Sequence, residues 1–242
     1  SIPSRATNKK DTMLKTLFQL CIFSCVLFSQ EKIYFQQEVN YEIDVVLNDD
    51  DHTLSAYEKI KYKNNSPDEL SFLWFHIWPN AYKDDSTAYA KQAGSNSRFA
   101  KSDSIDRGFI DSLDFRVDGR KIDWSYHPEW IDVVKLNLAS ILKPNETITI
   151  ETPFFVKLPG EVFSRLGHTG KHYEITQWYP KPAVYDKKGW HPMPYLNQGE
   201  FYSEFGTFDV KLTLPKDYKV MATGDLVDGE SEYLWLEGLT SK

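Results

Sequence analysis

The sequence predicts an all-β fold, specifically a saddle-like β-sandwich of about ten short antiparallel or mixed strands. Three observations favour it. Apolar and polar residues alternate through most of the chain after residue 30, a pattern typical of half-buried strands. Turn residues recur roughly every 8–12 positions, as between the strands of a sandwich. No segment shows a convincing amphipathic pattern for a helix longer than two turns.

The first strands are predicted between residues 41 and 78. Residues 41–47 and 54–62 both alternate, and the Asn48–Asp51 cluster between them predicts a hairpin. Residues 70–78 (LSFLWFHIW) are almost continuously apolar or aromatic, which is typical of a strand covered on both faces. Pro79 is expected to end that strand.

The later strands are predicted after a long surface loop. Residues 80–106 lack a clear period, and we expect only a short helix near residues 86–92. Asp118-Gly119 between two alternating runs strongly predicts a second hairpin. A glycine- and proline-rich middle occupies residues 159–199. The remaining strands are predicted at 134–138, 148–150, 154–156, 208–214, 218–222 and 233–235. No linker divides residues 30–242, which are expected to form one domain.

The start of the chain resembles a secretory signal. Residues 13–29 (MLKTLFQLCIFSCVLFS) combine a start residue, a lysine and an apolar run of about 12 residues, too short to span a bilayer. We therefore expect a signal peptide at 13–29, cleaved near Ser29, preceded by an upstream leader at 1–12. A buried N-terminal helix and a lipoprotein acylated at Cys25 are the alternatives. Export to the periplasm, cell surface or medium is predicted, with no transmembrane segment in the mature chain.

Composition excludes several functions. Removing residues 1–29 takes away four of the 28 basic residues, one of the 35 acidic residues and both cysteines, which leaves a net charge of −10. A disulfide-stapled scaffold and a four-thiolate zinc site are thereby excluded. An acidic chain is not expected to bind nucleic acid. Neither a nucleophile elbow nor a phosphate-binding loop occurs.

Histidines offer one possible metal site. His168 and His172 stand four residues apart, as in H-E-x-x-H zinc sites on a helix, but the glutamate of that motif is missing and Gly170 disfavours a helix. Two ordinary loop histidines are the competing interpretation. His76 lies in the apolar strand and fits a hydrogen-bonded core or rim residue. His191 is expected in a more open position.

Residues 175–186 (ITQWYPKPAVYD) are the most informative stretch. Three aromatic residues, two prolines and an amide lie close together, and prolines reduce the entropy lost when side chains are held in place. A rigid aromatic loop with polar tips suits the rim of a ligand or peptide pocket. An aromatic corner that only fills the end of the sandwich is the alternative.

Several segments together resemble a known family. They are Leu73–Tyr82, Thr176–Pro180, Val184–Asp186, Glu200–Val210 and the stretch from Pro215 to Gly224. In combination they resemble the N-terminal domain of aminopeptidase N-type (gluzincin) zinc metallopeptidases, particularly secreted bacterial members. The resemblance covers most of residues 33–238.

This resemblance implies a non-catalytic β domain followed by a catalytic domain that binds zinc through H-E-x-x-H. Neither that motif nor G-x-M-E-N occurs here, so we expect the catalytic domain to lie beyond Lys242, and no catalytic residue, metal ligand or cofactor in this chain. The expected partners are that domain and a peptide substrate. In the family, a T-Q-x-[QE] loop holds the substrate's free α-amino group.

The resemblance assigns four candidate binding residues. Gln177 matches the first amide of the family's loop, whereas Tyr179 replaces its second amide or carboxylate. Trp178 and Tyr179 offer cation–π contact instead, and Asp186 matches an aspartate that follows the loop. Two other functions stay open: a stand-alone secreted module that binds carbohydrate or protein through exposed tryptophans, and a metal enzyme that uses His168, His172 and an acid.

Overall fold

The computed structural model describes residues 34–161, 163–227 and 229–240. The predicted leader and signal peptide, residues 1–12 and 13–29, lie outside the described residues. The elements below all belong to one compact unit that begins at Gln36. None of the described helices is long and apolar enough to cross a membrane.

A large mixed sheet forms the first layer, in the order β15-β1-β2-β9-β5-β6, with β4 also paired to β9. All its pairs are antiparallel except β1 with β15. Its strands are β1 (Glu38–Asn48), β2 (Thr53–Lys63), β4 (Phe109–Asp111), β5 (Arg116–Val117), β6 (Arg120–Lys121), β9 (Thr147–Lys157) and β15 (Phe208–Thr213).

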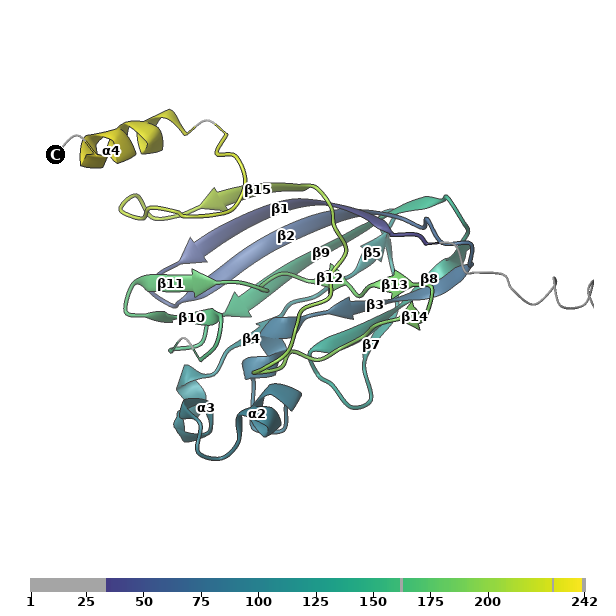
Figure 1. Cartoon of the computed structure of the whole chain (residues 1–242), viewed down its shortest axis with the longest axis horizontal. Helices are drawn as coiled ribbons and strands as arrows, with labels where there is room; N and C mark the ends of the chain where they lie inside the picture. The colour runs from purple at the N-terminus through teal and green to yellow at the C-terminus, as the bar shows by residue number, and fades with distance from the viewer. Residues whose placement is uncertain (1–33, 162, 228, 241–242) are drawn as a thin grey trace, which may run out of the picture. The chain divides into compact units, whose positions relative to one another are not determined.

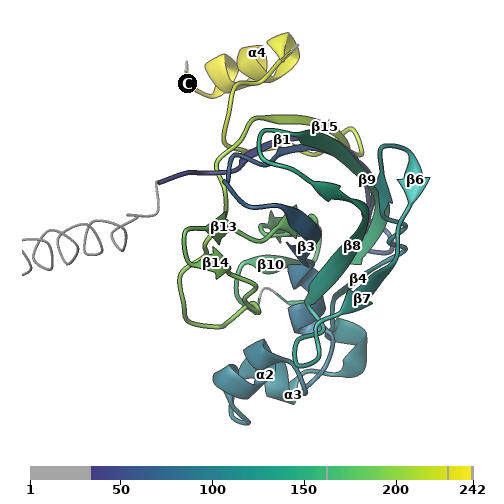
Figure 2. The same cartoon turned by 90° about the vertical axis from the view of Figure 1, so that its right-hand side faces the viewer.

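The second layer is a sheet of order β12-β3-β8-β7, which lies on the inner side of the curved large sheet (Figures 1 and 2). Two hairpins, β10-β11 and β13-β14, complete the strands. The bounds are β3 (Leu70–His76), β7 (Trp124–Tyr126), β8 (Val133–Leu142), β10 (Leu166–Thr169), β11 (His172–Ile175), β12 (Lys181–Pro182), β13 (Tyr185–Asp186) and β14 (Gly189–Trp190).

The core lies between these layers. Alternate residues of β1 and β2 are buried, because side chains on a strand point to opposite faces in turn. The buried side chains of β3 and β8 face them, with Leu73, Phe75, Val134 and Leu136 fully buried. Each such side chain contributes about 1.5–3 kcal/mol of stability. The all-β, sandwich-like fold is thus confirmed.

Short helices connect the sheets. They are η1 (Trp78–Tyr82), α2 (Ala88–Ala93), α3 (Arg98–Lys101) and η2 (Ser104–Asp106). The short helix expected near residues 86–92 is α2, and the Thr87 hydroxyl accepts a hydrogen bond from the Ala90 N–H at its start. The Asp118-Gly119 hairpin is also confirmed, with positive φ at both residues as a type I′ turn requires.

Three sequence-based expectations were wrong. Trp78 begins η1 rather than ending a strand, since Pro79 at the next position favours a helix start. Residues 218–222 form no strand. Residues 233–235 lie in α4 (Glu230–Thr240), which exceeds two turns and has no buried residue. Its leucines and glutamates favour a helix. Aromatic residues such as Tyr233 and Trp235 favour a strand only where a neighbouring strand packs against them.

Candidate functional site

The loop that carries Gln177 is anchored by a strand at each end. It follows β11 and leads into β12, where Lys181 pairs with His76 and Pro182 with Phe75 of β3. Gln177 has a φ of +56°, in the left-handed region that non-glycine residues rarely adopt. Such a conformation persists only where the surrounding structure imposes it, and it is concentrated at functional sites.

Lys181 contacts Gln177 directly. Its Nζ donates a hydrogen bond to Gln177 Oε1 and lies 4.1 Å from the centroid of the Trp78 ring. Only 4% of Lys181 is exposed, and this burial lowers its pKa to about 7. Gln177 itself is half-buried. The loop therefore places an amide side chain at the surface and a lysine ammonium directly behind it.

Trp178 and Tyr179 pack towards the large sheet. The Trp178 ring lies 5.8 Å from Phe154 on β9, and the Tyr179 ring lies 5.5 Å from Tyr41 and 5.9 Å from Phe208. Burial, and then the charge of Glu58, raise the pKa of Tyr179 to about 12. Both rings are half-buried, so they anchor the loop and keep part of their surface accessible.

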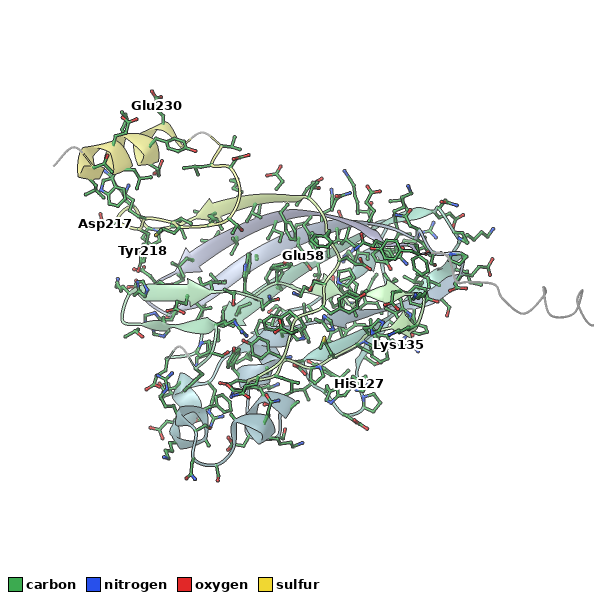
Figure 3. All side chains as sticks on the ribbon, viewed as in Figure 1. Glu58, His127, Lys135, Asp217, Tyr218 and Glu230 are labelled. Carbon is green, nitrogen blue, oxygen red and sulfur yellow. The ribbon has the colours of Figure 1, made fainter. Side chains whose placement is uncertain are left out.

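Glu58 is a buried carboxyl group behind these rings. It lies on β2 (Figure 3), is 0% exposed, and neither oxygen has a hydrogen-bond partner among the described residues. Burial raises its pKa well above the usual value, because a charged carboxylate is poorly solvated away from water. Burial therefore favours the protonated, neutral form of Glu58.

His76 and Trp78 form the floor beside Lys181. Their rings stack with centroids 4.5 Å apart, and His76 Nε2 accepts a hydrogen bond from the Met193 N–H at 3.2 Å. Burial, and then the nearby Lys181 charge, lower the pKa of His76 to about 3. The expectation of a hydrogen-bonded core histidine is confirmed, and His76 is neutral.

Asp186 lies on the β13-β14 hairpin, whereas Gln177 lies in the loop between β11 and β12. Its Oδ1 accepts hydrogen bonds from His191 Nε2 at 2.8 Å and from the Lys188 N–H at 2.7 Å, and its Oδ2 accepts one from the Tyr202 hydroxyl at 3.2 Å. Among the described residues, no hydrogen bond, ion pair or ring contact joins Asp186 to the Gln177 loop. The structure thus brings together Gln177, Trp178 and Tyr179 but not Asp186.

His168 and His172 do not form a helical pair. They lie on the two strands of the β10-β11 hairpin, where His168 pairs with Tyr173 and His172 with Thr169, so their side chains point to opposite faces. His168 stacks on His52 with ring centroids 3.6 Å apart. Within the described ranges, no three His, Cys, Asp or Glu side chains are grouped to hold a metal ion.

Sequence reasoning missed Lys181, Glu58 and the His191–Asp186 pair. Lys181 stands between two prolines in residues 175–186. This position could have indicated that its backbone is restricted. Glu58 occupies the one polar position on the face formed by Leu54, Ala56, Ile60 and Tyr62, a polar residue in an apolar row. For His191, no signal in the sequence indicates its partner.

The sequence matches no protein-family model, and no curated protein sequence matches it. Its fold is similar to solved M1 zinc metallopeptidases. One is a mutant from Deinococcus radiodurans bound to a Tyr-Ser-Ala substrate, with 14% identity and a TM-score of 0.44 over 80% of this chain and 35% of that one. The same enzyme without the mutation has 13% identity and a TM-score of 0.42 over the same shares. Native leukotriene A4 hydrolase from Saccharomyces cerevisiae has 16% identity and a TM-score of 0.28 over 53% of this chain and 16% of that one. The chain thus spans about a third of the first two solved structures.

Proposed function

We propose that this chain forms the non-catalytic N-terminal β domain of an exported aminopeptidase N-type zinc metallopeptidase. In this proposal the loop at residues 176–182 lines the wall that receives the N-terminal end of a peptide. Gln177 supplies the polar contact, and Trp178 and Tyr179 supply the apolar surface. Asp186 stabilises the neighbouring β13-β14 hairpin, and in this proposal it contacts the substrate from that hairpin.

One observation carries the proposal: two of the segments that resemble the family, Leu73–Tyr82 and Glu200–Val210, contact this loop. β12 pairs with β3 through Lys181 and His76, Lys181 Nζ lies 4.1 Å from the Trp78 ring, and Tyr179 contacts Phe208. These residues are far apart in the sequence. Their assembly around one strained, half-buried loop supports a recognition surface rather than a motif shared by chance.

Catalytic chemistry is assigned to a separate domain. The described residues offer no three-ligand group for zinc, so the metal does not fit this part of the chain and we derive no hydrolytic step here. The zinc, its ligands and the general base would belong to the catalytic domain. The β domain would bind and orient the peptide.

The test is Gln177→Ala in the natural full-length gene product. We expect kcat/KM for peptides with a free N-terminus to fall about tenfold, while the thermal unfolding temperature stays within experimental error of a Gln36→Ala control, an exposed amide on another part of the chain. Unchanged kinetics would show that the loop only packs, and absence of any peptide hydrolysis by the natural protein would refute the proposal itself.

A row of aromatic rings favours a second candidate, a secreted module that binds carbohydrate. Trp130 stacks on His127 at 4.2 Å, His127 lies 5.0 Å from Trp74, and Trp74 lies 6.2 Å from Phe72. Lys135 Nζ lies 4.1 Å above the Phe72 ring. All are half-buried, and Figure 3 shows His127 and Lys135 beside β7 and β8. Glycan binding that is lost on Trp74→Ala but kept on Gln177→Ala would favour this function over the first.

A further inference from the structure

Lys181 is held from two directions. Its backbone lies between Pro180 and Pro182 in β12, which pairs with β3, and prolines restrict the chain on both sides. Its head group donates to Gln177 Oε1 and lies over the Trp78 ring. The ammonium therefore occupies a fixed position behind Gln177.

This contact sets the direction of the Gln177 amide. An ammonium group only donates hydrogen bonds, whereas an amide accepts at its oxygen and donates at its nitrogen. When Lys181 is protonated, Oε1 therefore faces it, as in the structure, and Nε2 faces away from it. Within the described part of the chain Nε2 makes no hydrogen bond, and Gln177 is half-buried rather than covered. Two N–H donors are thus presented on a loop whose conformation is fixed.

The charge behind Gln177 is not neutralised. Among residues 34–161, 163–227 and 229–240, no carboxylate forms an ion pair with Lys181. The titratable groups that face it are His76 of β3, which is neutral, and Tyr179, whose ring centroid lies 5.9 Å from Nζ and whose phenol is also neutral. An uncompensated buried cation attracts an acceptor and repels a second cation.

We propose that Lys181 is a positioning residue that makes Gln177 a hydrogen-bond donor, so that this part of the wall takes a peptide carbonyl oxygen or carboxylate rather than the peptide's α-ammonium group. The inference rests on the proposed function and names which substrate atom Gln177 recognises. The Trp78 and Tyr179 rings already face the protein's own ammonium, so they do not serve as a cation–π site for the substrate.

The test compares two probes on the natural full-length protein. One is a tripeptide with a free N-terminus, and the other is its des-amino analogue, which keeps every carbonyl. We expect Gln177→Ala to weaken binding of both probes by the same factor, about tenfold. Lys181→Met should weaken both similarly, and Lys181→Arg, which keeps a donor, should restore most of the affinity. Lys83→Met, an exposed lysine, is the matched control and should change neither.

Different failures have different meanings. If the Gln177→Ala effect disappears with the des-amino probe, Gln177 recognises the ammonium and the inference is overturned while the proposed function stands. If neither probe binds the natural protein, the proposed function fails as well.

A spectroscopic readout tests the positioning role itself. In the full chain, the side-chain amide signals of Gln177 in a nitrogen–proton NMR spectrum should shift as Lys181 titrates. That titration should vanish in Lys181→Met and persist in Lys83→Met. A Gln177 signal that is unaffected by Lys181→Met would contradict the contact on which the inference depends.

Discussion

His191 Nε2 lies 2.8 Å from Asp186 Oδ1 across the β13-β14 hairpin. Burial alone would raise the pKa of Asp186, but the hydrogen bonds from His191, the Lys188 N–H and Tyr202 outweigh it and lower that pKa below its usual value. The carboxylate thus stabilises the fold above the unfolded-state pKa of 3.8, and this contribution is lost as the pH falls through the folded value.

We therefore expect Asp186→Asn to lower the unfolding temperature at pH 7. Because wild type loses the carboxylate's contribution in acid, the difference between the two proteins should shrink by pH 3. Thermal unfolding at both pH values checks this, with the exposed Asp217→Asn as the control. A difference that is the same at both pH values would show that the pair contributes through packing alone.

Glu58 gives the opposite pH dependence. Its pKa is raised by burial, so the folded state holds the proton more tightly than the unfolded state and stability falls as the pH rises above the unfolded value of 4.5. Glu58→Gln should remove this decline. Glu58→Leu should raise stability by about 1–3 kcal/mol, measured by urea unfolding at pH 5 and pH 8. A wild-type protein whose stability is equal at both pH values would contradict the buried, unpaired carboxyl.

Lys181 also destabilises the fold in its charged form. Its folded pKa of about 7 lies below the usual 10.5, so the unfolded state binds more protons between these values and stability rises with pH across that window. Lys181→Met should flatten the rise, and near pH 7 the variant should be more stable by a few kcal/mol. Chemical unfolding from pH 6.5 to 9.5 measures it. If the free energy of unfolding changed with pH in the same way for both proteins, Lys181 would not be buried.

The backbone at Gln177 can be tested separately from its side chain. A left-handed φ of +56° strains any residue with a Cβ atom, but not glycine. Gln177→Gly should therefore be more stable than Gln177→Ala by about 1 kcal/mol, while both lose the amide and bind peptide equally weakly. Equal stability of the two variants would place Gln177 in an unstrained conformation.

Alternation predicted the fold well where strands pair locally. Residues 41–47 and 54–62 form the β1-β2 hairpin, and Asp118-Gly119 forms the turn between β5 and β6. Prediction was weaker where a partner is distant. β9 runs unbroken through Pro153, which lies between the residues paired with β5 and those paired with β4. Only the assembled sheet reveals that this position tolerates proline.

The candidate loop could be selected from the sequence, but its chemistry could not. The prolines and aromatics of residues 175–186 predict the rigid rim of a pocket, and in the structure this stretch is anchored by strand pairing and ring contacts. The contact between Lys181 and Gln177 depends on a left-handed residue and on the register of β12 against β3, set by residues about a hundred positions away. The pattern of a single strand specifies which of its faces is buried, but not which distant strand it pairs with.

The most direct measurement is a structure of the natural full-length protein with a bound, non-hydrolysable peptide. We predict that the N-terminal end of the peptide contacts residues 176–179, with Gln177 Nε2 about 3 Å from a peptide carbonyl or carboxylate oxygen. A peptide bound elsewhere, with this loop facing only solvent or protein, would contradict the proposed role of the domain.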